Sequence, residues 1–413
     1  MYRNKKLIAG IIVLMILTSV ATLAISSILF MDFKQLNPEY SIIFDPQKVG
    51  KENIEKFNKV RTILKEMYYA EVDENKMIEG AIAGMTQSLG DVYTVYYTKE
   101  QMQKLMEISS KSEEVYVGIG VSVMMDNNGL LTVVEPFDGS PAAEVGIIQG
   151  DRIVKVDGED VTFIKDEDLI INKIKGPENT FVNITVFRPS EGRNIEFNVQ
   201  RRKVKYALNL RSEVLDGNIG YIRILSFNDR QISRIFNEAL DKLLAKGIKG
   251  LIIDVRDNPG GYYSGVVKIA DRLLPEGVIV YTEDKNKNQQ FEKSDETELG
   301  LPMVVLINGN SASASEVLAG AIKDHKKGML VGTRTFGKGL VQEIIPLNDG
   351  SGIKVTTARY FTPSGVCIHG IGIEPDVEVK LDDEYKDLPI SKVPRGDDVQ
   401  LKTALEILRA KVQ

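Results

Sequence analysis

The chain has 413 residues, of which 43% are hydrophobic, and this length predicts two or three domains rather than one core. The net charge is -6, with acidic and basic residues interleaved and no basic stripe, so no nucleic-acid partner is expected. The single cysteine, Cys367, excludes an internal disulfide framework and a cysteine metal cluster.

An uncharged apolar segment lies close to the start of the chain. It runs from Leu7 to Phe30, follows three basic residues, and is long enough to cross a bilayer. A cleaved signal peptide is the alternative, because small residues stand at Ala21 and Ala24, but the apolar run continues past them and favours a retained anchor. We assign residues 1–30 to this segment. We expect a single-pass cell-membrane protein with its catalytic part extracytoplasmic, or a secreted protein if the segment is cleaved.

Residues 31–112 are predicted to form an N-terminal helical region. Apolar residues recur at helical spacing in three sets, which begin at Ile54, Ile78 and Met102. These stripes either pack into the core of one subunit or form a homodimer contact, and both alternatives stand at this point.

Short strands separated by turns are predicted over residues 113–200, with one helix at 166–174. The strands are expected at 115–123, 130–134, 152–156 and 182–187. Within this region the segment from Tyr116 to Val121 resembles the carboxylate-binding loop and first strand of a PDZ domain. The segments from Gly139 to Gly146 and from Gly150 to Gly158 resemble that family's small helix and following strand.

A PDZ domain binds an extended C-terminus as an added strand, while loop amides hold the terminal carboxylate. The resemblance therefore implies that Gly118, Ile119, Gly120 and Val121 bind the C-terminus of a peptide. Lys175 follows the predicted helix and offers a positive charge, although an exposed lysine is by default a solvated surface residue.

Strand and helix patterns alternate over residues 201–380, which predicts a layered α/β domain. A helix is expected between a cap at Asn228 or Asp229 and a stop at Gly247, and the lysine-rich stretch 285–293 is expected to be a solvated loop. Residues 381–413 are predicted to form a C-terminal segment with one helix at 398–408. The strands of the α/β domain are expected at 218–224, 251–255, 303–307, 329–331, 340–347 and 353–358.

Three motifs in the α/β part contain residues suited to chemistry. The turn Asn258–Gly261 follows a strand, and its amides either face a substrate carbonyl or simply form the turn. The small residues of Ser311–Glu316 can raise a serine to a helix N-terminus, where free amides face developing negative charge. Ser313 with Glu316 also fits an ordinary capping box. The third motif, Gly332–Gly339, matches a phosphate loop except at its last position and precedes a strand-like pattern, so nucleotide binding is not expected.

Together these motifs resemble those of the carboxyl-terminal processing peptidases, or tail-specific proteases, which are serine peptidases with a PDZ domain. The resemblance implies that Ser313 is the nucleophile, that Lys338 is the base and that Gln342 orients the base. It also implies an oxyanion hole made by the amide of Gly260 or Gly261 together with that of Ala314. The implied peptidase core is an α/β fold related to the Clp protease and crotonase type.

A serine–lysine pair can carry out nucleophilic attack on a peptide bond without a metal or a cofactor. A lysine has an ordinary pKa of ~10.4, so it accepts a proton at neutral pH only where burial lowers that value. Desolvation achieves this without a metal, and we expect no metal and no cofactor. Gln342 would face the same side as the lysine four residues earlier if both lie on one alternating strand. The two histidines, His325 and His369, stand beside lysines and in a turn, which disfavours a histidine mechanism.

The sequence therefore predicts a multidomain α/β protein: a membrane-anchored extracytoplasmic serine endopeptidase that recognises protein C-termini through a PDZ domain. Its substrates are expected to be proteins or peptides with accessible, apolar C-termini. A gated protease of this kind can hold its serine and lysine apart at rest. The alternative is a catalytically silent, membrane-tethered PDZ scaffold that binds peptides.

Overall fold

The computed structural model describes residues 48–110, 115–126, 128–137, 139–205, 210–385 and 388–412, and the chain divides into two units after Met77. The segment expected to be the anchor, residues 1–30, lies outside the described residues. None of the helices within the described ranges is long and apolar enough to cross a membrane.

The first unit contains the helix α2 (Lys51–Met67), and not one residue of this helix is buried. Arg61 and Lys65 both form ion pairs with Glu74, where the next helix begins. The apolar stripe of α2 is therefore exposed within the described residues. Packing into a core, one of the two predicted roles of this stripe, is not seen there. The stripe consists of Phe57, Val60, Ile63, Leu64 and Met67.

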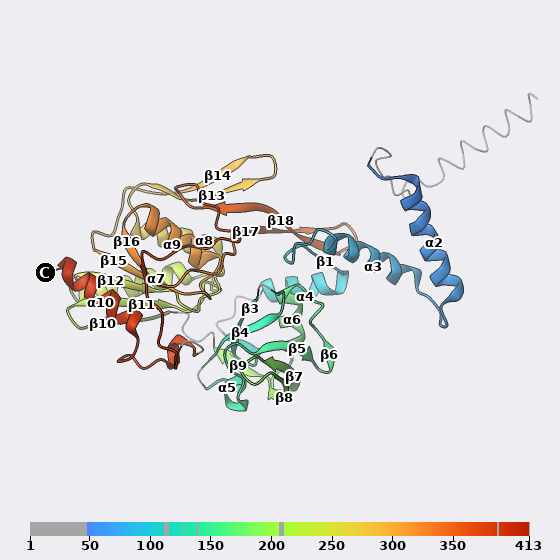
Figure 1. Ribbon diagram of the computed structural model, residues 1–413, viewed down its shortest axis with the longest axis horizontal. Coiled ribbons are helices and arrows are strands. Elements are labelled where there is room, and N and C mark those ends of the chain that lie inside the picture. The colour runs from blue at the N-terminus through green and yellow to red at the C-terminus, as the bar shows by residue number, and fades with distance from the viewer. Residues whose placement is uncertain are drawn as a thin grey trace, which may run out of the picture. The chain divides into compact units, whose positions relative to one another are not determined.

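The second unit begins inside the helix α3 (Glu74–Gln87), which is followed by β1 (Val95–Tyr97) and α4 (Lys99–Ser110). The strand β1 pairs antiparallel with the long strand β18 (Gly352–Phe361), with Val95 opposite Lys354. The N-terminal region thus contributes a strand to a sheet whose other strands come from the α/β region 201–380, which was predicted to be a peptidase core and is called the peptidase part below (Figure 1).

A six-stranded antiparallel sheet forms the PDZ-like region, in the order β3-β4-β5-β7-β8 with β6 beside β5. In its long strand β7, buried residues alternate with less buried ones from Phe181 to Val186, as expected for a sheet with one face in a core. The predicted strand 115–123 is divided in two at Gly120, whose φ of 77° favours glycine. The elements are β2 (Val115–Gly118), β3 (Val121–Met125), β4 (Leu131–Pro136), α5 (Pro141–Val145), β5 (Arg152–Val156), β6 (Glu159–Asp160), α6 (Glu167–Ile174), β7 (Phe181–Arg188), β8 (Arg193–Gln200) and β9 (Arg202–Lys205).

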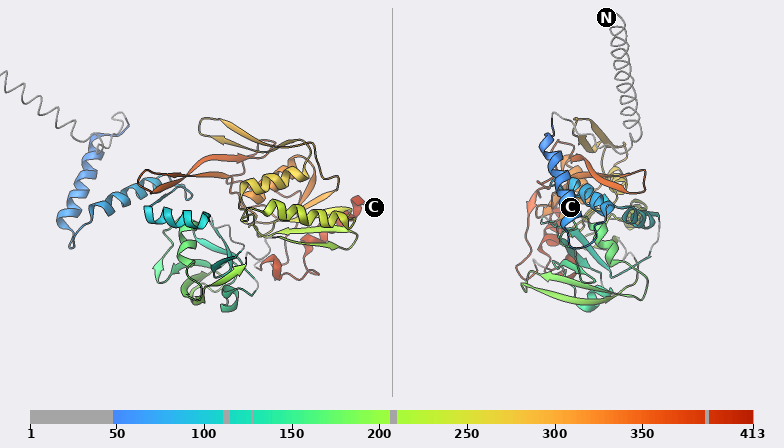
Figure 2. Two further views of the ribbon diagram at one scale, coloured as in Figure 1. Left: turned by 180° about the vertical axis from the view of Figure 1, so that it is seen from behind. Right: turned by 90° about the vertical axis from the view of Figure 1, so that its right-hand side faces the viewer.

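The peptidase part is built on a second six-stranded sheet, in the order β10-β11-β12-β15-β16-β19, in which all neighbours after β10 are parallel. Its central strands are buried along their whole length, because helices cover both faces. The helices α7, α8 and α9 pack on one face, and the C-terminal helix α10 packs on the other (Figures 1 and 2). The elements are β10 (Leu210–Leu215), β11 (Ile219–Ile224), α7 (Ile232–Ala245), β12 (Gly250–Asp254), α8 (Tyr263–Leu273), β15 (Met303–Ile307), α9 (Ala314–Asp324), β16 (Gly328–Gly332), β19 (Val377–Glu378), η2 (Ile390–Lys392) and α10 (Val399–Val412).

A further sheet runs in the order β1-β18-β13-β14, with β17 (Leu340–Pro346) also paired to β18. In the stretch 285–293, predicted to be a solvated loop, residues 285–288 form an exposed turn, but residues 289–293 belong to a strand: β13 (Gly277–Asp284) pairs with β14 (Gln289–Ser294) in a hairpin. The prediction was wrong for 289–293 because the polar side chains of β14 lie on an exposed edge strand, where hydrophobic alternation is weak.

Candidate active site

Ser313 stands at the junction between a buried strand and a helix. β15 ends at Ile307, and α9 begins at Ala314 with Ser313 as its N-cap. The φ of Ser313 is 55° and its ψ is -114°, a conformation that costs a non-glycine residue energy and that is typical of functional turns. The serine therefore lies where the first amides of a helix point.

The turn Asn258–Gly261 packs directly against this serine. A Cβ atom added to Gly260 would lie 2.8 Å from the Cβ of Ser313 and 3.1 Å from the nitrogen of Ala314. The carbonyl of Asn258 accepts hydrogen bonds from the amide of Ala312, at 3.0 Å, and from the hydroxyl of Ser315, at 2.9 Å. Only glycine fits at position 260, because its φ is 103° and the serine occupies the adjacent space.

The three predicted oxyanion donors differ in what their amides contact. The amide of Gly260 donates to the side-chain oxygen of Asn258 at 2.9 Å, so it is already engaged. No acceptor within the described residues takes the amide of Gly261 or of Ala314. Of the two glycine alternatives, this arrangement favours Gly261, whose amide is not committed to an internal bond.

Glu316 joins the serine loop to the lysine loop. One of its carboxylate oxygens accepts the amides of Ser313 and Lys338, each at 2.8 Å, and the other accepts the Thr335 hydroxyl at 2.6 Å and the Gly337 amide at 2.7 Å. Burial raises the pKa of Glu316, while these four hydrogen bonds act in the opposite direction. The carboxylate half of the expected capping box thus forms, and the same carboxylate also fixes the backbone of Lys338.

The side chain of Lys338 is bounded by two other regions. Its Nζ lies 3.8 Å from an oxygen of Glu167, on the PDZ-like helix α6, and 4.7 Å from the ring centroid of Tyr93. In the described part of the chain no hydrogen bond joins this amine to the hydroxyl of Ser313. The structure therefore brings the two backbones together on Glu316 while the amine contacts Glu167 and Tyr93.

Gln342 lies on β17, close to its start. Its amide nitrogen donates to the hydroxyl of Thr356 at 3.5 Å. The argument that Gln342 and Lys338 share a strand face was wrong: Lys338 precedes β17, and the pairing register shifts between Val341 and Gln342. A bulge of this kind breaks the simple alternation on which the argument depended.

The predicted PDZ ligand residues surround the turn that separates β2 from β3. Gly118 ends β2, Ile119 is buried in the PDZ-like core, Gly120 makes the turn, and Val121 begins β3, which is a terminal strand of its sheet. Lys175 is the C-cap of α6, and burial lowers its pKa, so it is not a fully solvated surface lysine. Because β3 is terminal, one of its edges has no partner strand among the described strands of this sheet, and addition of a peptide strand requires such an edge.

The PDZ-like region contacts the peptidase part beside the serine. Met124 and Val134 share a small apolar cluster with Ala312, the residue before Ser313. Glu135 pairs with Arg223 at 3.3 Å, and both residues are buried. The region therefore touches both sides of the candidate site, through this cluster and through Glu167.

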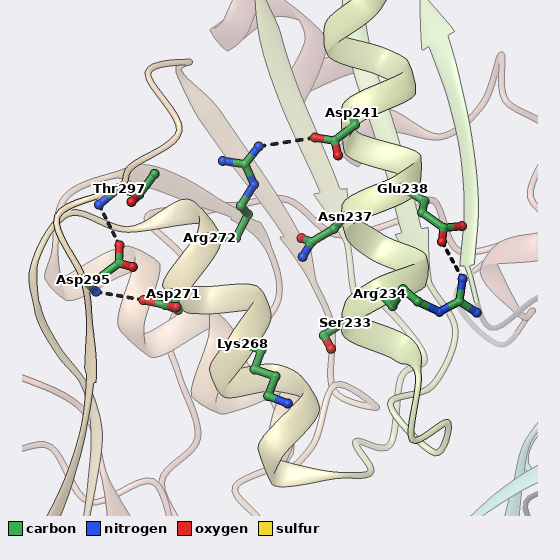
Figure 3. A pocket seen from close by; sticks show the side chains of 10 residues that line it. All are labelled: Ser233, Arg234, Asn237, Glu238, Asp241, Lys268, Asp271, Arg272, Asp295 and Thr297. Carbon is green, nitrogen blue, oxygen red and sulfur yellow. Dashed lines mark hydrogen bonds and ion pairs between the residues drawn. The ribbon is translucent and has the colours of Figure 1, made fainter.

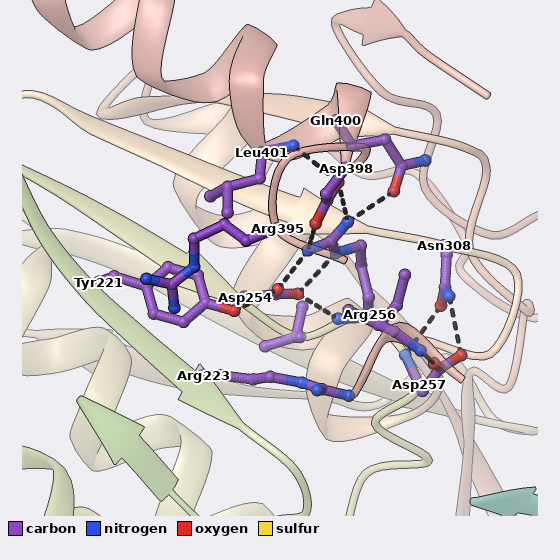
Figure 4. Close-up of polar contacts among 12 residues, drawn as sticks. Tyr221, Arg223, Asp254, Arg256, Asp257, Asn308, Arg395, Asp398, Gln400 and Leu401 are labelled. Carbon is purple, nitrogen blue, oxygen red and sulfur yellow. Dashed lines mark hydrogen bonds and ion pairs between the residues drawn. The ribbon is translucent and has the colours of Figure 1, made fainter. Parts of the chain in front are cut away.

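A buried charged network supports the turn from behind (Figure 4). Arg256, which is fully buried, donates to Asp254, to Asp398 and to the side-chain oxygen of Gln400. Burial alone would raise the pKa of Asp254, but the charge and hydrogen bonds of Arg256 lower it below its ordinary value. The C-terminal segment is thereby tied to the strand that leads into the Asn258 turn.

Asp257 adds a second set of bonds at the same level (Figure 4). Its carboxylate accepts from the side chains of Asn308 and Asn310, each at 2.8 Å, and from the amide of Ile390 at 3.0 Å. The loop before Ser313 and the segment after the last strand of the peptidase sheet are thus held by one side chain.

Three family models match the chain. The model for peptidase family S41 matches residues 218–379, the model for the N-terminal domain of the activating protease CtpB matches 26–101, and a PDZ domain model matches 132–188. A carboxy-terminal-processing protease of Bartonella bacilliformis is 35% identical over 391 residues, which cover 86% of this chain and 87% of that protein. The carboxy-terminal processing protease CtpA of Bacillus subtilis is 35% identical over 368 residues, covering 87% and 77%. This chain belongs to the carboxy-terminal processing proteases.

The fold agrees with that membership. The solved structure of a photosystem II D1 C-terminal processing protease superposes with a TM-score of 0.64 at 32% identity, covering 78% of this chain and 86% of that one. The chain is thus a multidomain α/β serine peptidase of the carboxy-terminal processing type with a PDZ domain, as the sequence motifs predicted. It acts on protein substrates.

A pocket of about 550 Å³ lies elsewhere on this protease, between α7 and α8 (Figure 3). Its lining is largely charged and includes Lys268 and two ion pairs, Arg234 with Glu238 and Arg272 with Asp241. Ser313, Lys338 and Gln342 do not line it, so this hollow is separate from the candidate active site.

Sequence reasoning missed Tyr93, Glu167 and the bridging role of Glu316. The local sequence signal for Glu316 was visible as a capping pattern, but its bonds to Gly337 and Lys338 span 21 and 22 residues. Glu167 and Tyr93 lie in separate regions of the chain, and no motif joins them to Lys338.

Proposed function

We propose that the protease cleaves peptide bonds with Ser313 as nucleophile and Lys338 as base, after its PDZ domain has engaged the C-terminus of a protein substrate. The observation that carries this proposal is the shared carboxylate of Glu316, one oxygen of which accepts the backbone amides of both residues at 2.8 Å. Side chains that start from two such points can meet across the turn formed by Asn258–Gly261.

The chemistry follows from the groups that surround Ser313. The neutral amine of Lys338 takes the hydroxyl proton as Ser313 attacks the peptide carbonyl, and it returns the proton to the leaving amine. The amides of Gly261 and Ala314 hold the oxyanion, with a contribution of ~3 kcal/mol per donor. Water then hydrolyses the acyl-enzyme with the lysine again as base. The family resemblance assigns to Gln342, on β17, the role of orienting the lysine.

We also propose that the arrangement described above is a resting one. The Nζ of Lys338 lies 3.8 Å from a carboxylate oxygen of Glu167, and this pairing engages the amine while no bond joins it to Ser313 in the described part of the chain. Binding of a substrate C-terminus along β3 would move α6 with its Glu167, because both elements belong to the PDZ-like region. The base would then be free to turn toward Ser313.

The cellular setting is part of the same proposal. Residues 7–30 anchor the protein in the membrane by a single span, with the protease domains outside the cytoplasm, or they direct its secretion if they are cleaved. The basic residues before the span and its uncharged length support this orientation. Substrates are then extracytoplasmic proteins with accessible, apolar C-termini.

Cleavage of casein by the full-length protein in detergent tests the dyad. Wild type is compared with Ser313→Ala and Lys338→Ala, with and without a chelator. We expect both variants to lose activity while their melting temperatures stay close to that of wild type, and we expect the chelator to have no effect. Retention of activity by either variant would contradict the dyad.

A calorimetric titration tests the role of the PDZ domain. Apolar C-terminal peptides are titrated into Ser313→Ala, each peptide with a free carboxylate and with a terminal amide. We expect amidation to weaken binding at least about tenfold, because the loop amides lose a charged acceptor. Equal affinity for the two forms would refute recognition of the C-terminus.

A further inference from the structure

Tyr93 approaches Lys338 from a part of the chain that lies outside every catalytic motif. Its ring centroid lies 4.7 Å from the Nζ of Lys338, within the range of a cation–π contact. Tyr93 belongs to the turn Asp91–Thr94 between α3 and β1, which is more than 200 residues from the lysine in sequence.

The turn that presents Tyr93 is built from its own hydrogen bonds. The carboxylate of Asp91 accepts the amide of Tyr93 at 2.9 Å and the hydroxyl of Thr94 at 2.6 Å. The hydroxyl of Thr94, which is buried, accepts the amide of Thr356 at 3.1 Å. The side chain of Thr356 in turn accepts from Gln342. The turn is therefore fixed to the same strand, β18, that Gln342 contacts.

The backbone of Lys338 has little freedom, which leaves its side chain as the adjustable part. Its amide is held by Glu316, and a Cβ added to Gly339 would lie 2.4 Å from the nitrogen of His369. A lysine side chain has several rotatable bonds, so its amine reaches a defined point only where neighbouring groups limit those bonds. Among the described residues, Tyr93 and Glu167 are the groups that contact this amine.

We propose that Tyr93 is a positioning residue for catalysis: its ring forms a wall that keeps the amine of Lys338 within reach of Ser313. This inference rests on the proposed serine–lysine dyad and adds to it a residue from the N-terminal region. Unlike Glu167, the ring presents an apolar face that packs against a neutral amine as well as attracting a charged one.

The ring, and not the hydroxyl, carries this role. Burial raises the pKa of Tyr93 to about 12, and the charges of Glu167, Asp91 and Glu316 act in the same direction. The phenol is therefore neutral at the pH of the reaction and takes no part as a proton acceptor. We therefore expect a phenylalanine at position 93 to perform the same positioning role as the tyrosine.

Steady-state cleavage of a fluorogenic peptide by the full-length protein tests the inference. We expect Tyr93→Leu to lower kcat about tenfold, equivalent to ~1.4 kcal/mol, while KM changes less than twofold. Tyr93→Phe should retain the kcat of wild type. The matched control is Tyr96→Leu, because Tyr96 lies three residues away and its hydroxyl bonds Glu79 instead. Melting temperatures are recorded for every variant, and Tyr93→Met serves as a second non-aromatic variant if Tyr93→Leu does not fold.

Several outcomes would overturn the inference. They are an unchanged or higher kcat in folded Tyr93→Leu or Tyr93→Met, an effect confined to KM, an equal loss in Tyr93→Phe, or an equal loss in Tyr96→Leu. Lys338→Ala is measured in parallel. If Lys338→Ala is inactive and Tyr93→Leu behaves as wild type, only the role of Tyr93 fails; if Lys338→Ala remains active, the dyad itself fails.

Discussion

The surroundings of Ser313 and of Lys338 are built in different ways. The serine loop, the Asn258 turn and the helix α9 all follow strands of one sheet, and they are cross-linked by short hydrogen bonds within the peptidase part. The amine of Lys338 instead contacts Glu167 from the PDZ-like region and Tyr93 from the N-terminal region. The nucleophile is thus preorganised by one core, whereas the base depends on three parts of the chain.

This difference indicates where such a protease can be regulated without loss of its fold. A change near Ser313 disturbs buried bonds and should affect both stability and activity. A change at Glu167 alters a contact that is partly exposed and should affect activity alone. The predictions below test this contrast.

The largest effect is expected from Glu316→Gln, because this carboxylate accepts hydrogen bonds from both the serine loop and the lysine loop. A glutamine has one acceptor oxygen, and its amino group would face backbone amides that also donate. We expect kcat to fall at least about 100-fold and the free energy of unfolding to fall by about 3 kcal/mol, since buried donors lose their acceptors. Casein cleavage and urea unfolding measure the two effects.

The control for this variant is Glu298→Gln, which changes an exposed glutamate paired with Lys327. It should leave both quantities unchanged within error. Wild-type kcat in Glu316→Gln would show that the shared carboxylate does not align the two loops.

The second-largest effect is expected from Arg256→Met, which removes the buried cation that pairs with Asp254 and Asp398 next to the Asn258 turn. Asp254 and Asp398 would remain buried without their cation, which typically costs about 3–5 kcal/mol of unfolding free energy. The pKa of Asp254 is lowered in the folded protein, so its stabilising contribution is complete above the unfolded value of 3.8 and is lost as the pH falls through the lower folded value. Urea unfolding should therefore show the largest difference from wild type near pH 7 and a smaller one below about pH 4.

Arg395→Met is the matched control, since Arg395 is an exposed arginine that pairs with Glu213 beside the same network (Figure 4). It should change the unfolding free energy by less than about 0.5 kcal/mol. A similar loss of unfolding free energy in both variants would mean that the stabilisation by Arg256 does not depend on its burial.

The sequence predicted the features that depend on local patterns. Strand β15, the small residues before α9 and the glycine turn at 258–261 are encoded within a few neighbouring positions, and the structure places Ser313 beside that turn. The PDZ-like strands and the helix α6 were also evident, because alternation and capping are local signals.

The features that the sequence did not predict depend on long-range pairing. Arg256 and Asp398 are 142 residues apart, and Tyr93 reaches Lys338 only because β1 pairs with β18. The bulge at Val341 and Gln342 also left no pattern in the sequence, since a register shift is set by the partner strand. Contacts of this kind follow from tertiary folding and not from periodicity.

The smallest effect is expected from Glu167→Gln, which removes the charge next to Lys338 and leaves the surroundings of Ser313 unchanged. The pair with Lys338 spans 3.8 Å and its glutamate side chain is 32% exposed, so the contact is worth at most about 1 kcal/mol. If Glu167 holds the amine at rest, its neutralisation should raise the rate of casein cleavage up to about fivefold. The unfolding free energy should stay within about 0.5 kcal/mol of wild type.

Glu159→Gln is the appropriate control, because Glu159 lies in the same PDZ-like region and pairs with Lys173, away from the site. The rise should also shrink when a saturating C-terminal peptide is present, since peptide binding and neutralisation of Glu167 would release the same amine. A fall in rate for Glu167→Gln would instead mean that this carboxylate assists the base. In that case the contact of Lys338 with Glu167 would belong to the active arrangement, as the contact with Tyr93 does, and regulation would have to act on the nucleophile side.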